Sequence, residues 1–327
     1  MPSFGYSLMC ELYGPNELLA QAARAEEAGF DFVTISDHFH PWLHSQRHSP
    51  YAWSVLGALA AQTSDIELVS LVTCPTIRYH PAIVAQKAAT VAVMSEGRFR
   101  LGVGAGENLN EHVVGRGWPP AHVRHEMLEE AIEIMRSLWE GHYYFHEGKH
   151  YAVHDARIFT LPEEPPPVYV AVSGTASVEL AARVGDGMVA TQPDAELTSG
   201  FDDAAGAGKP KYGQLALAVD DDEARARRTA RDLFRFGTPG WKVQSELPNP
   251  VNFEAATVSV REEDVAKDVS CGADADRHVE AIERWVSAGF DRIAIVALGD
   301  TDRFFELWEQ ELRRRLESVA ASAEATA

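Results

Sequence analysis

Polar side chains that could carry out chemistry follow several short apolar runs of this 327-residue chain. Glu11 follows the first run, Asp37, His38 and Trp42 follow the second, and Glu107 follows the fourth within a glycine-rich stretch. Imidazole has an unperturbed pKa of about 6.5, so a histidine beside carboxylates can accept or donate a proton at physiological pH. These residue types predict acid–base chemistry, provided that the fold brings the runs together.

Other chemistries are less well supported by the spacing. His38 and His40 could suggest a metal pair, but a third ligand at a characteristic spacing is missing, so we expect no metal. No Gly-x-Ser-x-Gly elbow is present, which argues against a hydrolase of that type. Gly102-Val103-Gly104-Ala105-Gly106 is followed by Glu107 rather than by a further glycine and is a weak phosphate motif. Asp37 as a loop cap and Trp42 as a packing residue remain open alternatives.

The elements that must position these residues alternate between strand and helix. The apolar, β-branched runs predict eight strands, at Phe4–Met9, Phe32–Ser36, Ile66–Thr73, Phe99–Val103, Val168–Val172, Gly187–Ala190, Gly213–Val219 and Arg292–Ala297. Amphipathic spacing predicts helices between and after them, at Pro15–Ala28, Tyr51–Gln62, Pro81–Met94, His122–Trp139, Ser177–Val184, Asp222–Phe236, Arg277–Ala288 and Thr301–Leu316. Eight such units predict an α/β fold, the (β/α)8 TIM barrel, with an open doubly wound sheet as the alternative.

Length and composition constrain the organisation. Barrels of this class run past 250 residues as one unit, so we expect a single domain over 1–327 with insertions near 141–167 and 237–269 at the C-terminal face. In such a barrel the chemistry lies at the C-terminal ends of the strands, which is where the polar residues fall.

The net charge and the cysteines limit the classes of partner and the compartment that we expect. The chain has 29 Lys and Arg against 49 Asp and Glu, a formal charge of −20, and we expect no nucleic-acid partner. The three cysteines show no metal-type spacing and are typical of free thiols in a reducing compartment. No signal peptide and no apolar run of about 20 residues is evident, so we expect a cytoplasmic protein without membrane contact.

Three segments together resemble a known family. They are Ser36-Asp37-His38-Phe39-His40-Pro41-Trp42, Pro75-Thr76-Ile77-Arg78-Tyr79-His80-Pro81-Ala82 and Gly102-Val103-Gly104-Ala105-Gly106-Glu107-Asn108-Leu109-Asn110-Glu111. In order and spacing they are similar to the signatures of coenzyme F420-dependent oxidoreductases of the luciferase-like superfamily, in the branch named for F420-dependent glucose-6-phosphate dehydrogenase. The resemblance covers the chain from Phe4 to about Leu316 and implies a barrel, a homodimer and a small-molecule substrate.

The resemblance also implies roles for the polar residues. His38 is expected to be the base for a substrate hydroxyl, Glu107 to handle a proton of the deazaflavin ring, and Trp42 to stand beside the reacting centre. We therefore expect these three to be catalytic. Asp37 is expected to contact the cofactor, and Glu11 to lie near the substrate pocket.

Further residues are implied to hold coenzyme F420. They are Val72, Cys74, Asn110, Ser173 and Gly174, together with Asp37 and Glu107. Cys74 stands where the dehydrogenase has a threonine. A non-prolyl cis peptide is expected at Leu71–Val72, where it would form a bulge against the deazaflavin ring.

The substrate site departs from the family pattern. The sugar-phosphate enzymes hold the phosphate with a threonine, a lysine three residues later and further basic residues; here Thr191 is kept, but Asp194 and Asp268 stand at two of the basic positions, and Lys242 aligns near a remaining lysine. Two acids in place of two bases repel a phosphate dianion. We expect Glu11, His38, Trp42, Thr191 and Asp194 to face the substrate, and glucose 6-phosphate not to be that substrate.

The predicted activity is hydride transfer between C5 of the deazaflavin and an alcohol or sugar. The alternatives are reduction of a C=C, C=N or C=O bond by reduced F420, an FMN-dependent luciferase-like monooxygenase, and an inactive cofactor carrier.

Overall fold

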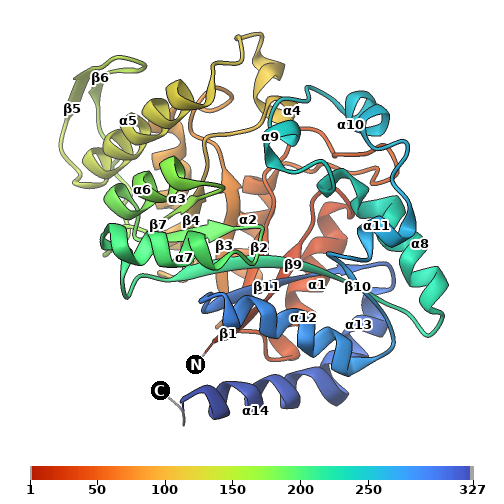
Figure 1. The fold of residues 1–327 in the computed structure, drawn as a ribbon. Coiled ribbons are helices and arrows are strands. Elements are labelled where there is room, and N and C mark those ends of the chain that lie inside the picture. Colours follow the sequence, from red (N-terminus) through yellow and green to blue (C-terminus); the bar gives the residue numbers. More distant parts are fainter. Residues whose placement is uncertain (1, 325–327) are drawn as a thin grey trace.

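A computed structural model describes residues 2–324, and within them eight parallel strands close into a barrel (Figure 1). The pairing runs β11-β1-β2-β3-β4-β7-β8-β9, and β9 returns to β11. The strands are β1 Ser3–Leu8, β2 Phe32–Ile35, β3 Glu67–Thr73, β4 Phe99–Val103, β7 Val168–Ala171, β8 Gly187–Ala190, β9 Lys211–Val219 and β11 Arg292–Leu298. Each predicted strand is present within about two residues, and the predicted (β/α)8 barrel is confirmed.

Helices surround the barrel. They are α1 Pro15–Glu27, α2 Ala52–Gln62, α3 Pro81–Met94, α5 Ala121–Trp139, α6 Thr175–Val184, α7 Ala195–Phe201, α8 Glu223–Phe234, α12 Ala275–Ser287, α13 Thr301–Leu307 and α14 Arg313–Glu324. The predicted helix Thr301–Leu316 is interrupted by a π turn at Trp308–Leu312. The sequence pattern indicates neither α7, which has only seven residues, nor the three-residue strand β10 Ser270–Gly272, which pairs with the end of β9.

The long connections carry structure of their own. An antiparallel hairpin, β5 Tyr144–Glu147 and β6 Ala152–Ala156, lies between α5 and β7. Between α8 and β10 the chain forms short helices α9 Trp241–Gln244, α10 Pro250–Ala256 and α11 Glu262–Val265, preceded by the turn η3 Arg235–Gly237. Figure 1 shows α9 and α10 at the same end of the barrel as α4 Asn108–Glu111, which follows β4.

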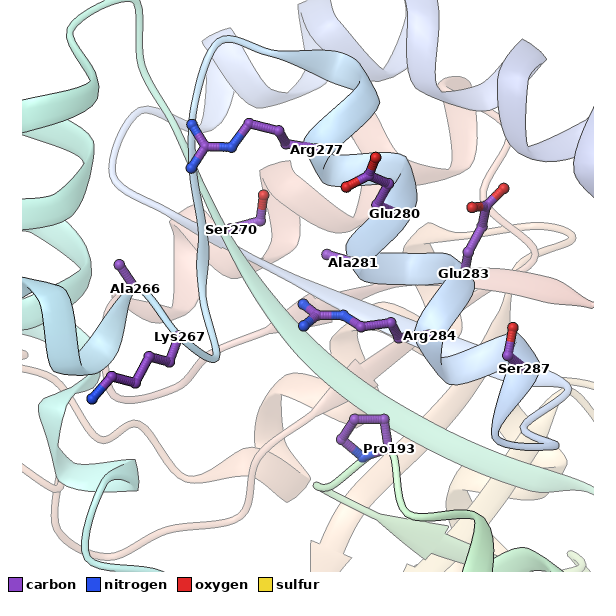
Figure 2. Close-up of a pocket in the computed structure, with 10 residues that line it drawn as sticks. All are labelled: Pro193, Ala266, Lys267, Ser270, Arg277, Glu280, Ala281, Glu283, Arg284 and Ser287. Carbon is purple, nitrogen blue, oxygen red and sulfur yellow. The ribbon is translucent and has the colours of Figure 1, made fainter.

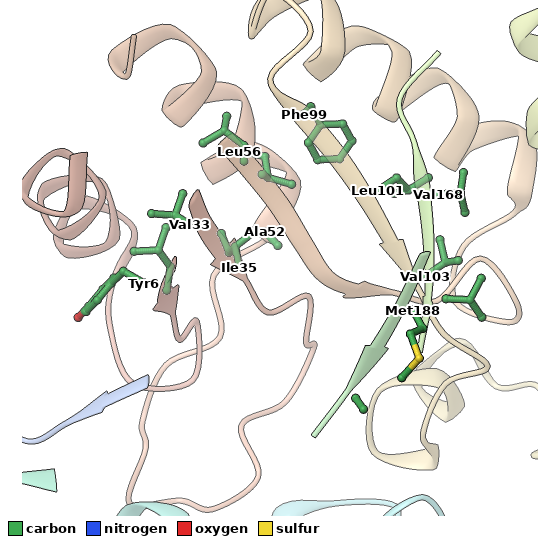
Figure 3. Packing of buried hydrophobic residues seen from close by; sticks show 14 of the residues in the cluster. Tyr6, Val33, Ile35, Ala52, Leu56, Phe99, Leu101, Val103, Val168 and Met188 are labelled. Atoms are coloured by element: carbon green, nitrogen blue, oxygen red, sulfur yellow. The ribbon is translucent and has the colours of Figure 1, made fainter. Parts of the chain in front are cut away.

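Two apolar layers hold the barrel together. The outer layer packs strand side chains such as Leu101, Val103 and Val168 against helix residues such as Leu56 (Figure 3). Because side chains alternate along a strand, the other set points inward. Phe32, Val69, Tyr169, Tyr212 and Val189 belong to a second buried cluster, formed by this inward set.

The inner cluster closes one end of the barrel. Phe32 and Tyr212 lie near the N-terminal ends of their strands and pack edge to face with ring centroids 5.3 Å apart. A Cβ on Gly5 would lie 2.2 Å from the Phe32 ring, so glycine is required where that ring crosses β1. Bulky side chains therefore fill the N-terminal end, and the C-terminal end is the one at which we expect a ligand.

Within residues 2–324, we find no helix with the length and apolar character needed to cross a bilayer.

Candidate active site

A histidine held between two carboxylates is the centre of the C-terminal face. His38 Nδ1 forms an ion pair with Glu11 Oε1 at 2.7 Å, and His38 Nε2 lies 3.6 Å from Glu107 Oε1. The three side chains come from the ends of β1, β2 and β4 and are at most 10% exposed. The barrel thus brings together three polar residues that are separated by up to 96 positions in the sequence.

Glu11 is fixed by the neighbouring strand end. Ser36 Oγ donates a hydrogen bond to Glu11 Oε2 at 2.8 Å and accepts one from the Cys10 backbone N–H at 3.0 Å. Glu11 is fully buried, and its two oxygens therefore serve two different partners, Ser36 and His38. This arrangement holds the imidazole in one orientation.

The electrostatics of the trio favour a charged histidine. Burial alone would lower the pKa of His38, but the carboxylates of Glu11 and Glu107 outweigh burial and raise the pKa above its ordinary value. For Glu11 burial acts in the opposite sense, and the neighbouring His38 and Ser36 outweigh it and lower the pKa. His38 is therefore a stronger base than a free imidazole.

Trp42 forms an aromatic wall beside His38. Its ring packs edge-on to the His38 ring at 4.8 Å, is stacked on Phe236 at 4.8 Å with an interplanar angle of 1°, and meets Phe253 edge-on at 5.1 Å. Phe236 and Phe253 belong to η3 and α10, in the connection after β9. Phe253 lies in the predicted insertion near 237–269 and Phe236 at the end of the predicted helix Asp222–Phe236, and neither was among the expected site residues.

Asp37 lies in a buried polar network that locks two loops together. Its Oδ2 accepts hydrogen bonds from Trp53 Nε1 at 3.1 Å and Thr73 Oγ1 at 2.8 Å. Its Oδ1 accepts hydrogen bonds from Arg78 Nη2 at 3.1 Å and Tyr79 O–H at 3.2 Å. Asp37 is 2% exposed and both carboxylate oxygens are engaged, so it anchors the loop after β2 to the loop after β3.

Asn110 connects the loops that carry Glu107 and His38. Its Nδ2 donates to Glu107 Oε1 at 2.5 Å, and its Oδ1 accepts from the backbone N–H groups of Phe39 and His40 at 2.8 and 3.0 Å. The amide thus sets the distance between two of the expected catalytic side chains.

Small side chains surround the strand ends next to this centre. The peptide bond Leu71–Val72 is cis, as the resemblance implies, and Val72 is half-buried. A Cβ on Gly104 would lie 2.9 Å from Val72 and 3.8 Å from Cys74 Sγ, so only glycine leaves this surface clear. Cys74 is buried, and burial raises the pKa of its thiol well above the ordinary range.

The start of α6 is open. A Cβ on Gly174 would meet nothing within 4 Å, and Ser173 is exposed. The backbone N–H groups of Ser173 and Gly174 donate to Ser177 Oγ at 2.9 and 3.2 Å, which fixes the turn. The positive end of the dipole of this ten-residue helix faces the open space.

The expected substrate residues after β8 are exposed. Asp194 Oδ1 accepts a hydrogen bond from the Glu196 N–H at 2.9 Å and caps α7, so this acid has a structural task. Thr191 is exposed, as is Asp268 in the segment before β10.

A pocket of about 710 Å³ lies close by, between Pro193, the segment before β10 and α12 (Figure 2). Its cations are Lys267, Arg277 and Arg284, and Glu280 and Glu283 also line it. Lys267 is paired with Asp264 at 3.0 Å, and Arg277 with Glu223 at 3.1 Å. None of His38, Glu11 and Glu107 lines this pocket, so it is separate from the histidine–carboxylate centre.

In the part of the chain that the structure describes, no three or more His, Cys, Asp or Glu side chains gather as metal ligands.

The barrel with buried acid–base groups at its C-terminal face defines the class of protein, a TIM-barrel enzyme scaffold. Residues 4–292 match the family described as Luciferase-like monooxygenase, and the chain belongs to this family.

Curated relatives span nearly the whole chain. A Microbacterium testaceum protein named F420-dependent glucose-6-phosphate dehydrogenase is 38% identical over 325 residues, covering 96% of this chain and 97% of the relative. A Beutenbergia cavernae protein with the same name is 36% identical over 330 residues, covering 97% and 98%.

Solved structures agree with the fold. An F420-dependent secondary alcohol dehydrogenase in complex with an F420–acetone adduct superposes with a TM-score of 0.89 at 29% identity, covering 94% of this chain and 97% of that chain. The coenzyme F420-dependent tetrahydromethanopterin reductase from Methanopyrus kandleri has a TM-score of 0.77 at 21% identity, covering 96% and 99%, and supports the fold alone.

Proposed function

We propose that this protein is an F420-dependent oxidoreductase that transfers a hydride between the deazaflavin and the carbon of an alcohol, or of a sugar whose phosphate is not bound. The observation that carries the proposal is the placement of His38 between Glu11 and Glu107 at the strand ends. The names of the curated relatives and of the alcohol dehydrogenase structure support the choice of cofactor.

The residues around this centre fit a planar cofactor with an anionic tail. The surface at Val72, Gly104 and Cys74 is free of protruding side chains, and open space adjoins Gly174 at the positive end of α6. A helix N-terminus favours a phosphate by its dipole and backbone N–H groups. Val72, Cys74, Glu107, Asn110, Ser173 and Gly174 would hold the cofactor, with Asp37 fixing the loop beneath them.

When bound, F420 supplies a ring carbon, C5, that takes up or releases a hydride. The chain's own residues handle the protons. With Nδ1 paired to Glu11, His38 presents Nε2 to a substrate hydroxyl and accepts its proton in alcohol oxidation. Glu107 is the carboxyl group that exchanges the ring proton, and Asn110 orients it.

The same groups serve the reverse direction. A protonated His38 donates to the oxygen of a carbonyl as the carbon receives a hydride, because an acid and a base exchange roles on reversal. Glu11 is best described as a positioning residue, since its partners are His38 and Ser36.

The wall beside His38 favours an uncharged substrate. Trp42, Phe236, Phe253 and Leu109 form one buried apolar cluster. Asp194 and Asp268 are exposed acids at positions where the resemblance expects bases. We therefore propose a compact alcohol or an unphosphorylated sugar rather than glucose 6-phosphate, and a homodimer as the working assembly, which sedimentation velocity would measure.

The test is turnover of F420 by the purified protein without oxygen. The absorbance of oxidised F420 is followed with 2-propanol, glucose and glucose 6-phosphate, and the reverse reaction is followed with reduced F420 and acetone. We expect turnover with an uncharged alcohol or its ketone. No turnover in either direction, with FMN-dependent oxygen consumption instead, would overturn the proposal in favour of a monooxygenase.

A further inference from the structure

The segment between Arg235 and Ala256, here called the cap, bridges two of the loops that carry expected catalytic residues. On one side Phe236 and Phe253 pack against Trp42, and Gln46 Nε2 donates to the Leu233 carbonyl at 3.0 Å, just before the cap. On the other side the Asn108 backbone N–H donates to the Ser245 carbonyl at 2.9 Å. Asn108 directly follows Glu107, so the cap contacts this loop at the residue next to the expected catalytic glutamate.

A single buried arginine joins the cap to that loop. Arg124, in the first turn of α5, is 4% exposed. Its Nη1 donates to the Gly106 carbonyl at 3.0 Å, and its Nη2 donates to Glu246 Oε1 of the cap at 3.1 Å. Its guanidinium lies over the Trp118 ring at 4.0 Å.

Trp118 also binds Glu246 and strengthens the connection between the cap and the loop after β4. Its indole Nε1 donates to Glu246 Oε2 at 3.0 Å, so the two oxygens of one carboxylate receive the arginine and the tryptophan. Asn108 Nδ2 adds a hydrogen bond to the Glu246 carbonyl at 3.0 Å. Glu246 is thus held by Asn108 and Trp118 from the segment between β4 and α5 and by Arg124 from the first turn of α5.

We infer that Arg124 is a positioning residue, which orients the Gly106–Glu107 peptide and fastens the cap over the same loop through Glu246. The inference rests on the proposed function for the role of Glu107, but the contacts themselves do not depend on it. Gly106 has a positive φ of 86°, and a Cβ there would lie 2.9 Å from the Glu111 side chain, so the arginine holds a carbonyl in a conformation that favours glycine.

Arginine suits this task better than any other cation. Its planar guanidinium carries donors in a fixed fork, so it can bind a carbonyl and a carboxylate at once and still stack on an indole. A lysine ammonium keeps the charge but cannot reproduce both directions and the stacking. Within residues 2–324, Arg124 Nε has no hydrogen-bond partner, so the contacts of the guanidinium offset only part of the cost of burying its charge. A role in positioning the loop explains a buried arginine at this place better than a contribution to stability does.

The experiment compares Arg124→Lys and Glu246→Gln with the matched control Glu129→Gln. Glu129 forms a two-bond ion pair with Arg183 at 2.9 and 2.8 Å on α5 and α6, and neither residue belongs to the site. Hydrogen–deuterium exchange of the ligand-free protein is measured on peptides spanning 104–112 and 241–247. The kcat and KM of F420-dependent turnover are measured on the same samples.

We expect exchange to be faster by about tenfold or more in both peptides for both site variants, since each loses a charge-assisted hydrogen bond. The control leaves both peptides unchanged. We further expect kcat to fall by about tenfold in Arg124→Lys while the Kd for F420 changes by less than about threefold, because Glu107 is displaced but the other residues that would hold the cofactor stay in place.

Two results would overturn the inference. One is unchanged exchange in the 104–112 and 241–247 peptides of both variants. The other is an increase spread evenly over the barrel strands, which would show a loss of global stability instead of a local joint. If exchange changes as expected but neither the variants nor the unmodified protein turns over F420, the positioning role of Arg124 is supported and the proposed function is wrong.

Discussion

Substitution of Glu11 by glutamine isolates the electrostatic part of the histidine–carboxylate arrangement. The carboxylate presents one oxygen to Ser36 and the other to His38. Glutamine keeps the side-chain volume, but it has one acceptor oxygen, whereas the carboxylate uses two, one for His38 and one for Ser36. It also removes the negative charge that raises the pKa of His38.

The size of the effect follows from replacing the charged partner of His38 by a neutral one. A hydrogen bond to a charged group contributes about 1.5–3 kcal/mol and a neutral one about 0.5–1.5 kcal/mol, a difference of about 1–1.5 kcal/mol. A difference of this size is about a tenfold change in the equilibrium between charged and neutral His38, so the pKa of His38 should fall in Glu11→Gln. Because alcohol oxidation requires neutral His38 in the free enzyme, the acid limb of the kcat/KM profile should move to lower pH, and kcat/KM on that limb should rise relative to its plateau by about tenfold.

The assay is the pH dependence of kcat/KM for F420 reduction by an alcohol substrate. Glu17→Gln, an exposed carboxylate on α1, serves as the control and should leave the profile in place. Plateau kcat should also fall in Glu11→Gln, since the imidazole is a weaker base and is held less firmly. An acid limb that stays in place, or moves to higher pH, would refute the assignment of Glu11 as the residue that raises the pKa of His38.

Three further predictions concern single residues. His38→Ala should reduce kcat by about 100- to 10,000-fold, the range for a general base, while fluorescence titration shows F420 binding within a few-fold of the unmodified protein; full turnover would remove His38 from the mechanism. Glucose 6-phosphate should be a poor substrate, and Asp194→Lys should lower its KM about tenfold or more by adding a charge-assisted hydrogen bond, whereas a KM in the micromolar range for the unmodified protein would contradict the substrate argument. Burial is the main cause that raises the pKa of Glu111 from 4.5 to about 7, so the folded protein holds this proton more tightly than the unfolded chain, and this contribution to stability is complete below pH 4.5 and lost as the pH rises through about 7. In denaturant titrations, the unfolding free energy of the unmodified protein should therefore fall by up to about 3 kcal/mol over that pH interval, and this fall should be absent from Glu111→Gln. An equal fall in both proteins would show that Glu111 is not its source.

The barrel itself could be predicted because each of its strands has a strong local signature. Continuous apolar runs such as Ile293–Ala297 are typical of strands buried on both faces. The short elements α7 and β10 lack such a signature: β10 has three residues and exists because the end of β9 has an unpaired edge there. Tertiary context of this kind is not encoded in local periodicity.

The site was predictable in its residue types but not in its connections. Strand ends of a parallel barrel meet, so Glu11, His38 and Glu107 could be grouped from their positions alone. That Glu11 pairs with His38 rather than lying free near a substrate depends on side-chain directions that only the folded chain reveals. Phe253 was missed because a connection rich in Pro and Asn gives no period from which to infer which of its aromatic residues turn inward. Phe236 was missed because it falls at the end of the predicted helix Asp222–Phe236, whereas α8 ends at Phe234 and Phe236 lies in the turn η3.

The choice between F420 and FMN separates an F420-dependent oxidoreductase from a flavin-dependent monooxygenase, and a binding titration decides between them. Purified protein is titrated with F420 and, under the same conditions, with FMN, and ligand fluorescence is followed to saturation. We predict saturable binding of F420 in the micromolar range or tighter, and FMN binding at least about tenfold weaker, which corresponds to about 1.4 kcal/mol. Tight binding of FMN with no binding of F420 would show that this protein is not an F420-dependent enzyme.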